Sequence, residues 1–433
     1  MKILGLDIGT TTVSAVVIDG GKVLSSVTLP NGSFLHSENP WEKIQDPDYI
    51  RNTALKAVDR LLAQYPEVER IGVTGQMHGI VYLDKNGEPV SPLYTWQDGR
   101  GDQLYNSTET YASYLTHRTG YQVATGYGLV THAYNLAHHL VPQEARVLCT
   151  IHDYVAMVLS GKKIPVTEES DAASFGLFDV KHGCFDVNAL DAVGISKEML
   201  PKIVADSMIG YYKGEIPVYV AIGDNQASFL GAANGNLNTM LVNVGTGSQF
   251  SVYSKEYIEC AGLETRPFPG GYLVVGASLC GGRAYAMLEN FMRLCAEAMT
   301  GDTAESCYGA MDQLLRENEM PEDLPQITPL FQGTRHDPSL RGSITNISTE
   351  NFAPRHLIWA MLEGMTRELY NMYQCYLQAG GAEAQLIGSG NGLRKNVHLQ
   401  GCFSRIFGQE VLMSDCCEEA ATGAALYAAM QLT

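Results

Sequence analysis

The chain has 433 residues, 45% of them hydrophobic and 18% charged, which is typical of a globular protein of two or three domains. Its 29 basic and 47 acidic side chains give a net charge of −18. The negative electrostatic potential that results from this charge disfavours nucleic acid and anionic membrane surfaces as partners. A bound polyanion would therefore have to be held by local backbone dipoles and metal.

The cysteines and the N-terminus indicate a reducing compartment. None of the 10 cysteines forms a C-x-x-C motif, which argues against a structural zinc site, and free thiols in this number suit the cytoplasm. The first residues carry an acid within a short apolar run, unlike a signal peptide. No apolar stretch approaches the ~20 residues of a membrane-spanning helix. We therefore expect a cytoplasmic protein.

The first half opens with a β-hairpin. Residues 2–8 and 13–18 are apolar, β-branched strands joined by a polar turn, and a tight turn leads to a third strand over 22–29. The other elements expected in this half are a helix over 48–65, a strand over 70–74, and helical stretches over 104–140 and 152–160.

The second half repeats this opening. Strands are expected over 239–244 and 249–254, again joined by a Gly-Thr turn. This predicts a duplicated unit at the start of two related α/β domains, 1–235 and 236–433, although so short a match also arises by chance. The elements expected after it are helices over 282–299, 303–317, 354–378, 394–407 and 418–430, and a strand over 384–388.

Three glycine-rich turns are candidates for holding phosphates. The turn Gly9–Thr12 follows Asp7, and its amides can cradle phosphate oxygens while the carboxylate holds Mg²⁺ through water. Gly245–Ser248 repeats these features, so two such loops facing one another would grip a triphosphate. Gly388–Gly392, between a strand and a helix, offers close backbone approach to adenine and ribose. Each is equally a plain turn, and no Walker A motif occurs.

Two segments of the first half suit a sugar. Gln76, Met77 and His78 follow an apolar strand, so the imidazole can bind sugar hydroxyls while the thioether packs on the carbon face. A lone loop histidine is, however, more often a surface donor. The run Tyr94–Arg100 combines an aromatic ring, an amide, a carboxylate and a guanidinium, which suits a polyhydroxylated ligand. Its Asp98 and Arg100 can instead simply pair with each other.

Asp224 is the candidate catalytic residue. It follows an apolar strand in Ala-Ile-Gly-Asp-Asn, and a carboxylate at the carboxyl end of a strand facing a crevice can accept a proton from a bound hydroxyl. Asp and Asn are also ordinary turn and cap residues. The two phosphate-loop candidates in separate halves of the chain are what favour the catalytic interpretation.

Together these motifs resemble the FGGY carbohydrate kinases, of the sugar kinase, chaperone ATPase and actin superfamily. Gln-Met-His-Gly and Trp-Gln-Asp-Gly-Arg look like the ketose kinases, and Gly-Tyr-Gly-Leu-Val-Thr is similar to the sedoheptulokinase branch. The resemblance covers nearly the whole chain and is carried by Asp7–Thr12, Gly75–Gly79, Trp96–Arg100, Gly223–Gln226, Gly245–Ser248, Gly281–Gly282, Gly388–Asn391 and Glu419–Ala425.

The resemblance implies two ribonuclease-H-like domains, with ATP and sugar bound in the interdomain cleft. Asp224 matches the catalytic base, and Asp7 and Asp224 match the carboxylates near Mg²⁺. The matching nucleotide-binding residues are Gly9, Thr10, Thr11, Gly245, Thr246, Gly247, Gly282, Gly388, Gly390 and Asn391. The matching sugar-binding residues are Gln76, Met77, His78, Trp96, Tyr127, Asp224 and Asn225.

The expected function is ATP-dependent phosphorylation of a ketose at its terminal primary hydroxyl. Sedoheptulose is the expected sugar, and a xylulokinase or another pentulose or polyol kinase is the alternative. The expected partners are ATP, Mg²⁺ and a small-molecule sugar, and a homodimer is a family-level expectation. An actin-like or chaperone-type ATPase would instead turn over ATP without sugar, and a sugar sensor would lack catalysis. The sugar-suited segments argue against the former, and Asp224 argues against the latter.

Overall fold

The computed structural model divides the chain into two compact units. The first comprises Met1–Asn236, Arg266–Gly270 and the described part of Cys416–Thr433, and the second comprises Leu237–Thr265 and Gly271–Asp415. The structure describes residues 1–205, 207–303, 305–317, 319–334, 337, 339–416 and 418–430.

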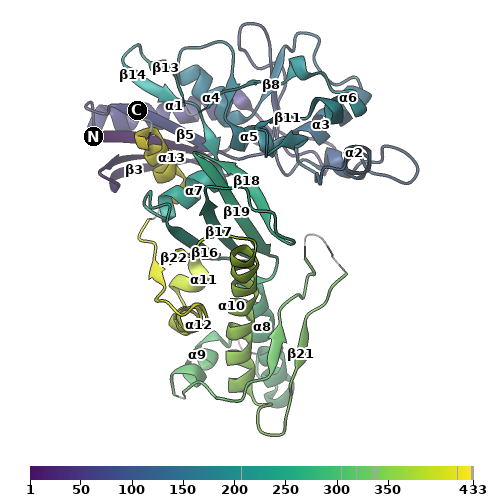
Figure 1. The fold of residues 1–433 in the computed structure, drawn as a ribbon, viewed down its shortest axis with the longest axis vertical. Coiled ribbons are helices and arrows are strands. Elements are labelled where there is room, and N and C mark those ends of the chain that lie inside the picture. The colour runs from purple at the N-terminus through teal and green to yellow at the C-terminus, as the bar shows by residue number, and fades with distance from the viewer. Residues whose placement is uncertain are drawn as a thin grey trace. The chain divides into compact units, whose positions relative to one another are not determined.

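The first unit is built on a seven-stranded sheet (Figure 1) of order β13-β14-β5-β1-β2-β3, with β15 also paired to β5. The first three strands are antiparallel, whereas β5 runs parallel to β1 and β15 runs parallel to β5. The strands are β1 (Lys2–Ile8), β2 (Thr12–Asp19), β3 (Lys22–Pro30), β5 (Arg70–Gly75), β13 (Met208–Tyr212), β14 (Ile216–Tyr219) and β15 (Ile222–Gly223).

The register of the parallel strands brings three chain segments to one edge of this sheet. Ile8 at the end of β1 lies opposite Gly75 at the end of β5, and Gly75 lies opposite Gly223 at the end of β15. Parallel strands end at the same edge, so the residues that follow each of them meet there. This edge is where the predicted sugar and catalytic residues of the first unit lie.

Helices and short strands complete the first unit. The predicted helix over 48–65 is confirmed as α1, whose N-cap Asp46 accepts hydrogen bonds from two backbone amides. The predicted helical stretch over 104–140 is two helices, because Gly120 in the left-handed region ends the first of them. The helices are α1 (Pro47–Gln64), η1 (Gly99–Asp102), α2 (Tyr111–Thr119), α3 (Gly128–Ala137), α4 (Ile151–Leu159), α5 (Glu169–Ser174), α6 (Val187–Ala192), η2 (Lys197–Met199), α7 (Asp224–Ala232) and α13 (Glu419–Met430). The short strands are β4 (Ile44–Gln45), β6 (Val81–Leu83), β7 (Leu93–Tyr94), β8 (Val147–Cys149), β9 (Val166–Thr167), β10 (Phe178–Asp179), β11 (Cys184–Phe185) and β12 (Lys202–Ile203).

The last helix, α13, packs on the first unit, although the predicted boundary places residues 236–433 in a second domain. A Cβ on Gly5 of β1 would lie 1.8 Å from the backbone oxygen of Ala421, and one on Gly72 of β5 would lie 1.9 Å from that of Ala424. The helix therefore rests directly on the strand backbones, as its Ala- and Gly-rich sequence allows. This non-local fit explains why α13 clusters with the first unit, whereas the predicted domain boundary at residues 235/236 stays a prediction.

The second unit repeats the hairpin and parallel-strand arrangement of the first. Strands β16 and β17 form an antiparallel hairpin, and β22 pairs parallel to β16, just as β5 pairs with β1. The sheet order is β18-β19-β17-β16-β22-β23. The strands are β16 (Thr239–Val244), β17 (Ser248–Ser254), β18 (Glu264–Phe268), β19 (Gly271–Ser278), β22 (Gln385–Ser389) and β23 (Leu412–Met413), with a separate hairpin of β20 (Gln326–Thr328) and β21 (Ser343–Thr345).

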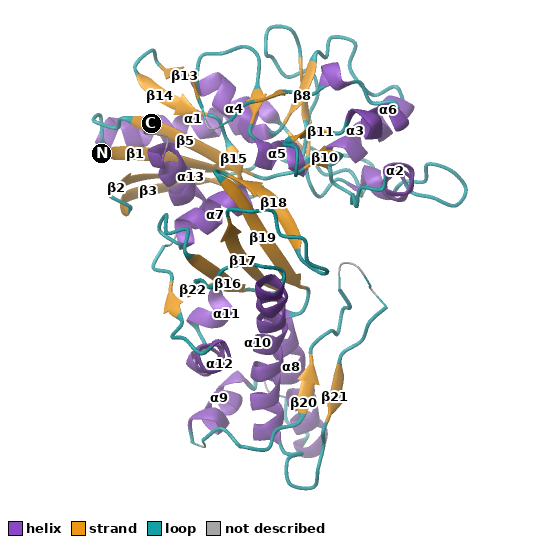
Figure 2. Cartoon of the chain, viewed as in Figure 1, coloured by secondary structure: helices purple, strands orange, loops and turns teal. Residues whose placement is uncertain are grey.

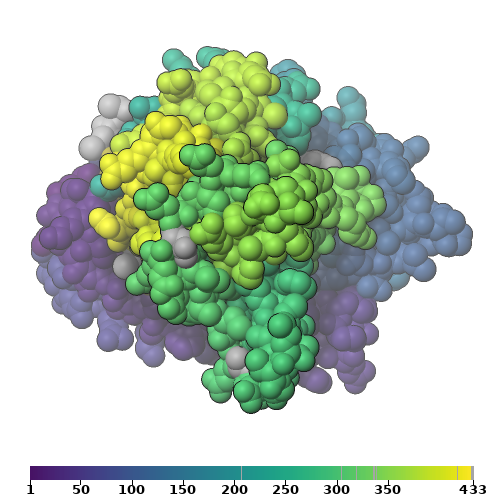
Figure 3. All heavy atoms as spheres, turned by 90° about the horizontal axis from the view of Figure 1, so that it is seen from below, coloured from purple at the N-terminus to yellow at the C-terminus, as the bar shows by residue number. Residues whose placement is uncertain are grey.

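Long helices pack in this unit, where α10 runs beside α8 (Figure 2). Figure 3 shows the chain as spheres, seen from below the view of Figure 1. The predicted helix over 394–407 is broken at Asn396, whose side chain caps the second piece. The helix predicted over 303–317 begins only at Tyr308, and residue 304 lies outside the described residues. The helices are α8 (Gly281–Thr300), α9 (Tyr308–Arg316), α10 (Pro354–Gln378), α11 (Asn391–Arg394) and α12 (Val397–Phe407).

Two further features bear on the sequence-based expectations. Nine cysteines lie among the described residues, and all nine are free thiols. None of the described helices has both the length and the apolar character needed to cross a bilayer.

Candidate active site

Asp224 is the first residue of α7, directly after β15. The turn before it is held by two hydrogen bonds, one from the Thr74 hydroxyl to the Ile222 oxygen (2.7 Å) and one from the Gly223 amide to the Ser170 hydroxyl (3.1 Å). Burial raises the pKa of the Asp224 carboxyl, while the nearby charges of His152 and Arg266 lower it. A helix N-terminus favours a negative charge. The carboxylate is thus rigidly placed at the sheet edge, as a proton acceptor must be.

Asp7, near the end of β1, lies in a cluster of acids. Burial, together with the charges of Asp224 and Glu418, raises the pKa of the Asp7 carboxyl to about 7. Like charges at such a site are relieved when a cation binds. No group of three or more His, Cys, Asp or Glu side chains that could hold a metal is found within the described ranges. The donor set fits Mg²⁺, which usually takes one or two carboxylates and completes its shell with water and substrate phosphate.

A buried polar contact, between His152 and Asp171, was not anticipated from the sequence. The His152 Nε2 lies 2.8 Å from the Asp171 Oδ1, and both side chains are fully buried. Burial raises the pKa of Asp171, and the charge of Asp224 raises it further, so the pair lies near the candidate base. His152 and Asp171 stand in α4 and α5 in ordinary helical sequence, which gave no signal.

Thr10 connects the predicted phosphate loop to two predicted sugar-binding residues. Its hydroxyl donates to the Gln76 Oε1 (3.2 Å) and accepts from the Trp96 Nε1 (3.0 Å). Gln45 joins the network, because its amide nitrogen donates to the Thr10 carbonyl (2.9 Å) and its oxygen accepts from Gln76 (2.9 Å). Trp96 remains 46% exposed, so its ring can contact a ligand. Thr11 and the half-buried Gly9 lie on either side of Thr10.

His78 is held in a fixed orientation. Its Nδ1 lies 2.7 Å from the Ser174 carbonyl oxygen, and its ring stacks on Tyr127 with centroids 4.5 Å apart. A carbonyl only accepts, so Nδ1 carries the proton and Nε2 is the acceptor in the neutral ring. The backbone has φ 72°, a strained conformation for a histidine that often marks functional sites. Nε2 is therefore suited to accept a hydrogen bond from a hydroxyl.

Met77 and Asn225 lie beside the turn that carries Asp224. Met77 is only 8% exposed, and its sulfur would be 2.7 Å from a Cβ placed on Gly223. Its thioether thus packs on the turn, and its contact with a sugar stays a prediction. Asn225 is half-buried, and its Oδ1 accepts a hydrogen bond from Arg266 (3.0 Å).

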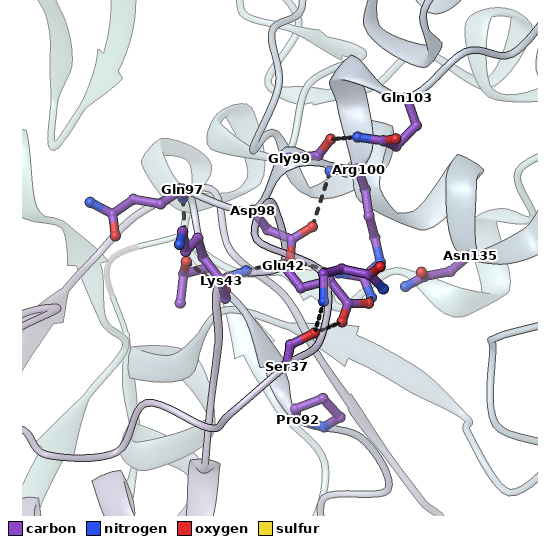
Figure 4. A network of polar contacts seen from close by, with 12 residues as sticks. Ser37, Glu42, Lys43, Pro92, Gln97, Asp98, Gly99, Arg100, Gln103 and Asn135 are labelled. Carbon is purple, nitrogen blue, oxygen red and sulfur yellow. Dashed lines mark hydrogen bonds and ion pairs between the residues drawn. The ribbon is translucent and has the colours of Figure 1, made fainter.

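Asp98 and Arg100 pair with each other (Figure 4), as one of the two sequence interpretations expects. The Arg100 Nη1 lies 2.6 Å from the Asp98 Oδ2, and its Nη2 lies 2.7 Å from Glu42. Both partners of the first pair are almost completely buried, and the guanidinium stacks over the Tyr94 ring at 4.4 Å. These residues support the loop that presents Trp96.

The second unit contains a pocket of about 1080 Å³ that collects predicted nucleotide-binding residues from three separate segments. Two further predicted residues, Gly247 and Gly388, are not among the residues that line it. Beside the predicted residues stand cations and tyrosines that the sequence did not single out. The predicted lining residues are Gly245, Thr246, Gly282, Gly390 and Asn391.

Close backbone contacts shape this pocket. The Gly282 amide donates to the Gly245 oxygen (2.8 Å), and the Arg283 amide donates to the Thr246 oxygen (3.0 Å), so the start of α8 fixes the loop after β16. Gly390 has φ 84°, and a Cβ there would lie 2.6 Å from the Val244 oxygen. These positions need glycine, which explains the sequence pattern.

The residues missed by the sequence give the pocket its chemical character. Arg283 and Lys395 line it and favour an anionic ligand despite the net charge of −18. Arg316 also lines the pocket but is paired with Asp312 (2.8 Å). Tyr285 and Tyr308 stack with centroids 5.9 Å apart and offer a flat aromatic wall. Of these, Arg283 directly follows the predicted residue Gly282, and Lys395 lies three residues after the predicted loop Gly388–Gly392, so both could have been found. Cations beside an aromatic wall suit a nucleotide, with its phosphates and flat base.

Family models match both parts of the chain. The N-terminal domain model of the FGGY family of carbohydrate kinases matches residues 2–231, and the C-terminal domain model matches residues 240–432. The chain belongs to the FGGY family of carbohydrate kinases. It is therefore a sugar phosphotransferase, and ATP is the phosphoryl donor that the family implies.

Individual relatives agree with this assignment. Human sedoheptulokinase is 30% identical over 98% of this chain and 96% of its own length, and the xylulose kinase of Bacillus subtilis is 23% identical over 99% and 87%. The crystal structure of the xylulose kinase of Rhodospirillum rubrum superposes with a TM-score of 0.80 at 22% identity, covering 100% of this chain and 90% of that one. The predicted α/β fold with two ribonuclease-H-like domains is confirmed by this superposition.

Proposed function

We propose that this FGGY kinase transfers the γ-phosphoryl group of ATP to the terminal primary hydroxyl of a ketose, and that the ketose is sedoheptulose. The observation that carries the proposal is the convergence of Asp224, Gln76 and His78 at one edge of the first sheet. The similarity to human sedoheptulokinase supports the choice of sugar. The similarity to the Bacillus subtilis xylulose kinase supports xylulose as the second candidate.

In this proposal the sugar lies along the sheet edge of the first unit. The Nε2 of His78 accepts a hydrogen bond from one sugar hydroxyl, while Trp96 covers the carbon face. Asp224 accepts the proton of the terminal hydroxyl as its oxygen attacks the γ-phosphorus in line. The carboxylate needs only to be ionised and near the hydroxyl. Orienting the alcohol in this way is the main contribution of the first unit.

The pocket of the second unit is the proposed nucleotide site. Tyr285 and Tyr308 are placed to contact the base, and the loop of Gly245 and Thr246 to contact the phosphates. Asp7 and Asp224 are the residues that would hold Mg²⁺, which when bound neutralises charge on the phosphate oxygens. Arg283 and Lys395 add positive charge along the pocket wall.

A coupled ADP-release assay with sedoheptulose, xylulose, ribulose, fructose and glycerol tests the proposal. We expect rapid, sugar-dependent turnover with sedoheptulose and slower turnover with the others. Comparable rates with glycerol and the ketoses would contradict the substrate assignment. ADP release that does not depend on any sugar would instead favour an actin-like or chaperone-type ATPase.

His78→Asn tests the sugar contact. Asparagine tolerates positive φ, so the backbone is retained, but the ring that stacks on Tyr127 and the acceptor Nε2 are lost. We expect the KM for the sugar to rise about tenfold, the equivalent of one lost hydrogen bond with its packing. The KM for ATP should stay unchanged, and steady-state kinetics with each substrate varied in turn measures both. An unchanged sugar KM would remove His78 from the proposed site.

The pKa of Asp7 predicts how Mg²⁺ binding depends on pH. Its pKa is raised from 3.8 to about 7 in the folded protein, so its contribution to folding stability is present at low pH and falls as pH rises through this window. Mg²⁺ requires the ionised carboxylate. We therefore expect Mg²⁺ with ADP to raise the melting temperature more at pH 8 than at pH 6.

Asp7→Asn should abolish most of this pH-dependent difference, whereas Asp19→Asn, at an exposed acid of the same hairpin, should leave it intact. Thermal unfolding with Mg²⁺ and with a chelator at each pH measures the effect. An equal Mg²⁺ response in the wild type and in Asp7→Asn would show that Asp7 does not contact the metal.

A further inference from the structure

Arg266 lies in β18, an edge strand of the β16–β19 sheet, but residues 266–270 cluster with the first unit, although their neighbours in sequence on both sides belong to the second. Two contacts hold this segment on α7. The fully buried Gln226 donates to the Pro267 oxygen (2.9 Å), and the Phe268 ring meets the Phe229 ring edge-on at 5.6 Å. The position of Arg266 beside the start of α7 is therefore built into the fold.

The guanidinium of Arg266 fixes the orientation of the Asn225 amide. Its Nη1 lies 3.0 Å from the Asn225 Oδ1. A guanidinium carries only donors, so the amide oxygen must face Arg266 and the NH₂ group must face the other way. Asn225 is adjacent to Asp224, and the charge of Arg266 is close enough to lower the pKa of that carboxyl.

We propose that Arg266 is a positioning residue of the sugar site, which holds Asn225 so that its NH₂ group donates to an acceptor oxygen of the sugar. This proposal rests on the proposed function, because it takes the sugar to be the ligand beside Asp224. Without the guanidinium, the amide is free to rotate by 180° and present its oxygen instead. Arg266 thereby sets the hydrogen-bond polarity at this point of the site.

Steady-state kinetics with sedoheptulose varied at saturating ATP test the proposal. The variants to compare are Arg266→Met, Asn225→Ala and the double variant. Methionine keeps much of the length of the side chain and removes its donors. We expect Arg266→Met to raise the KM for the sugar about tenfold with a smaller change in kcat. The double variant should be no worse than Asn225→Ala within about twofold, because residues acting through one contact are not additive. Arg266→Lys, which keeps a donor, should recover part of the loss.

Arg70→Met is the matched control. Arg70 lies in the same unit and donates to the backbone oxygen of Ala428 (2.9 Å), so its loss should lower the melting temperature and leave the sugar KM unchanged. A purely structural role for Arg266 would give this same result, and it would overturn the proposal. Fully additive losses in the double variant would also overturn it, because Arg266 would then act independently of Asn225.

Assays of the wild-type enzyme distinguish a failure of the proposed function from a failure of the proposed role of Arg266. Sugar-dependent turnover by the wild type together with a normal sugar KM in Arg266→Met refutes the role of Arg266 and leaves the proposed function intact. No sugar-dependent turnover by the wild type refutes the proposed function, and the role of Arg266 with it.

Discussion

Asp224→Asn is expected to abolish most sugar-dependent turnover while leaving the fold intact. Asparagine has the same shape but cannot accept the proton of the attacking hydroxyl. General-base catalysis is worth roughly 10²–10⁴-fold in rate, and a loss of that order in kcat is expected. The side chain opens α7, and asparagine is also tolerated at a helix start. The melting temperature should therefore change little.

Binding measurements distinguish a loss of catalysis from a loss of substrate binding in this variant. ADP affinity measured without Mg²⁺ and sugar affinity measured by calorimetry should remain near the wild-type values. Asp186→Asn is a suitable control, because Asp186 caps α6 in the same unit and asparagine caps equally well, so turnover should be normal. Near-normal turnover of Asp224→Asn would refute its assignment as the base.

The elements of both sheets were predictable because their signals are local. Apolar alternation and Gly-Thr turns located the hairpins that open each unit, and the strand ends located the segments after Ile8, Gly75 and Gly223. Parallel pairing then brings those ends together without further information. This part of the candidate site follows from strand periodicity alone.

What the sequence did not predict depends on contacts between distant residues. The pairing of α13 with β1 and β5 arises from facing small residues, such as Gly5 and Ala421, that are more than four hundred positions apart in the chain. Arg266 and the His152–Asp171 pair reach the site from segments without a recognisable motif. Local sequence patterns carry no information about contacts between residues that are distant in the chain.

Other residues were found but their partners could not be decided from sequence. The sequence offered Asp98 and Arg100 either as ligands or as a pair, and the 2.6 Å contact between them selects the pair. The pocket of the second unit shows the same limit. Its glycines were predicted, whereas Arg283, Tyr308 and Lys395 become pocket residues only once α8, α9 and α11 are packed around them.

Gly390→Ala is expected to disrupt the nucleotide pocket and to destabilise the second unit. Gly390 has φ 84° and ψ 153°, a region that is essentially restricted to glycine, and a Cβ would lie 2.6 Å from the Val244 oxygen. Strain and overlap together should cost about 3 kcal/mol or more of folding free energy. Val244 leads directly into Gly245 and Thr246, so a displaced backbone should also raise the KM for ATP by at least about tenfold.

Gly401→Ala is the matched control for this substitution. Gly401 lies exposed in α12, and a Cβ there would have no neighbour within 4 Å. Alanine inside a helix should stabilise the protein by about 0.5–1 kcal/mol relative to glycine and leave the ATP KM unchanged. Chemical denaturation and ATP-dependent kinetics of the two variants separate the cost of a specific backbone conformation from the general effect of adding a methyl group. If Gly390→Ala behaved like Gly401→Ala, the tight contact between the strand β16 and the loop after β22 would not control the pocket.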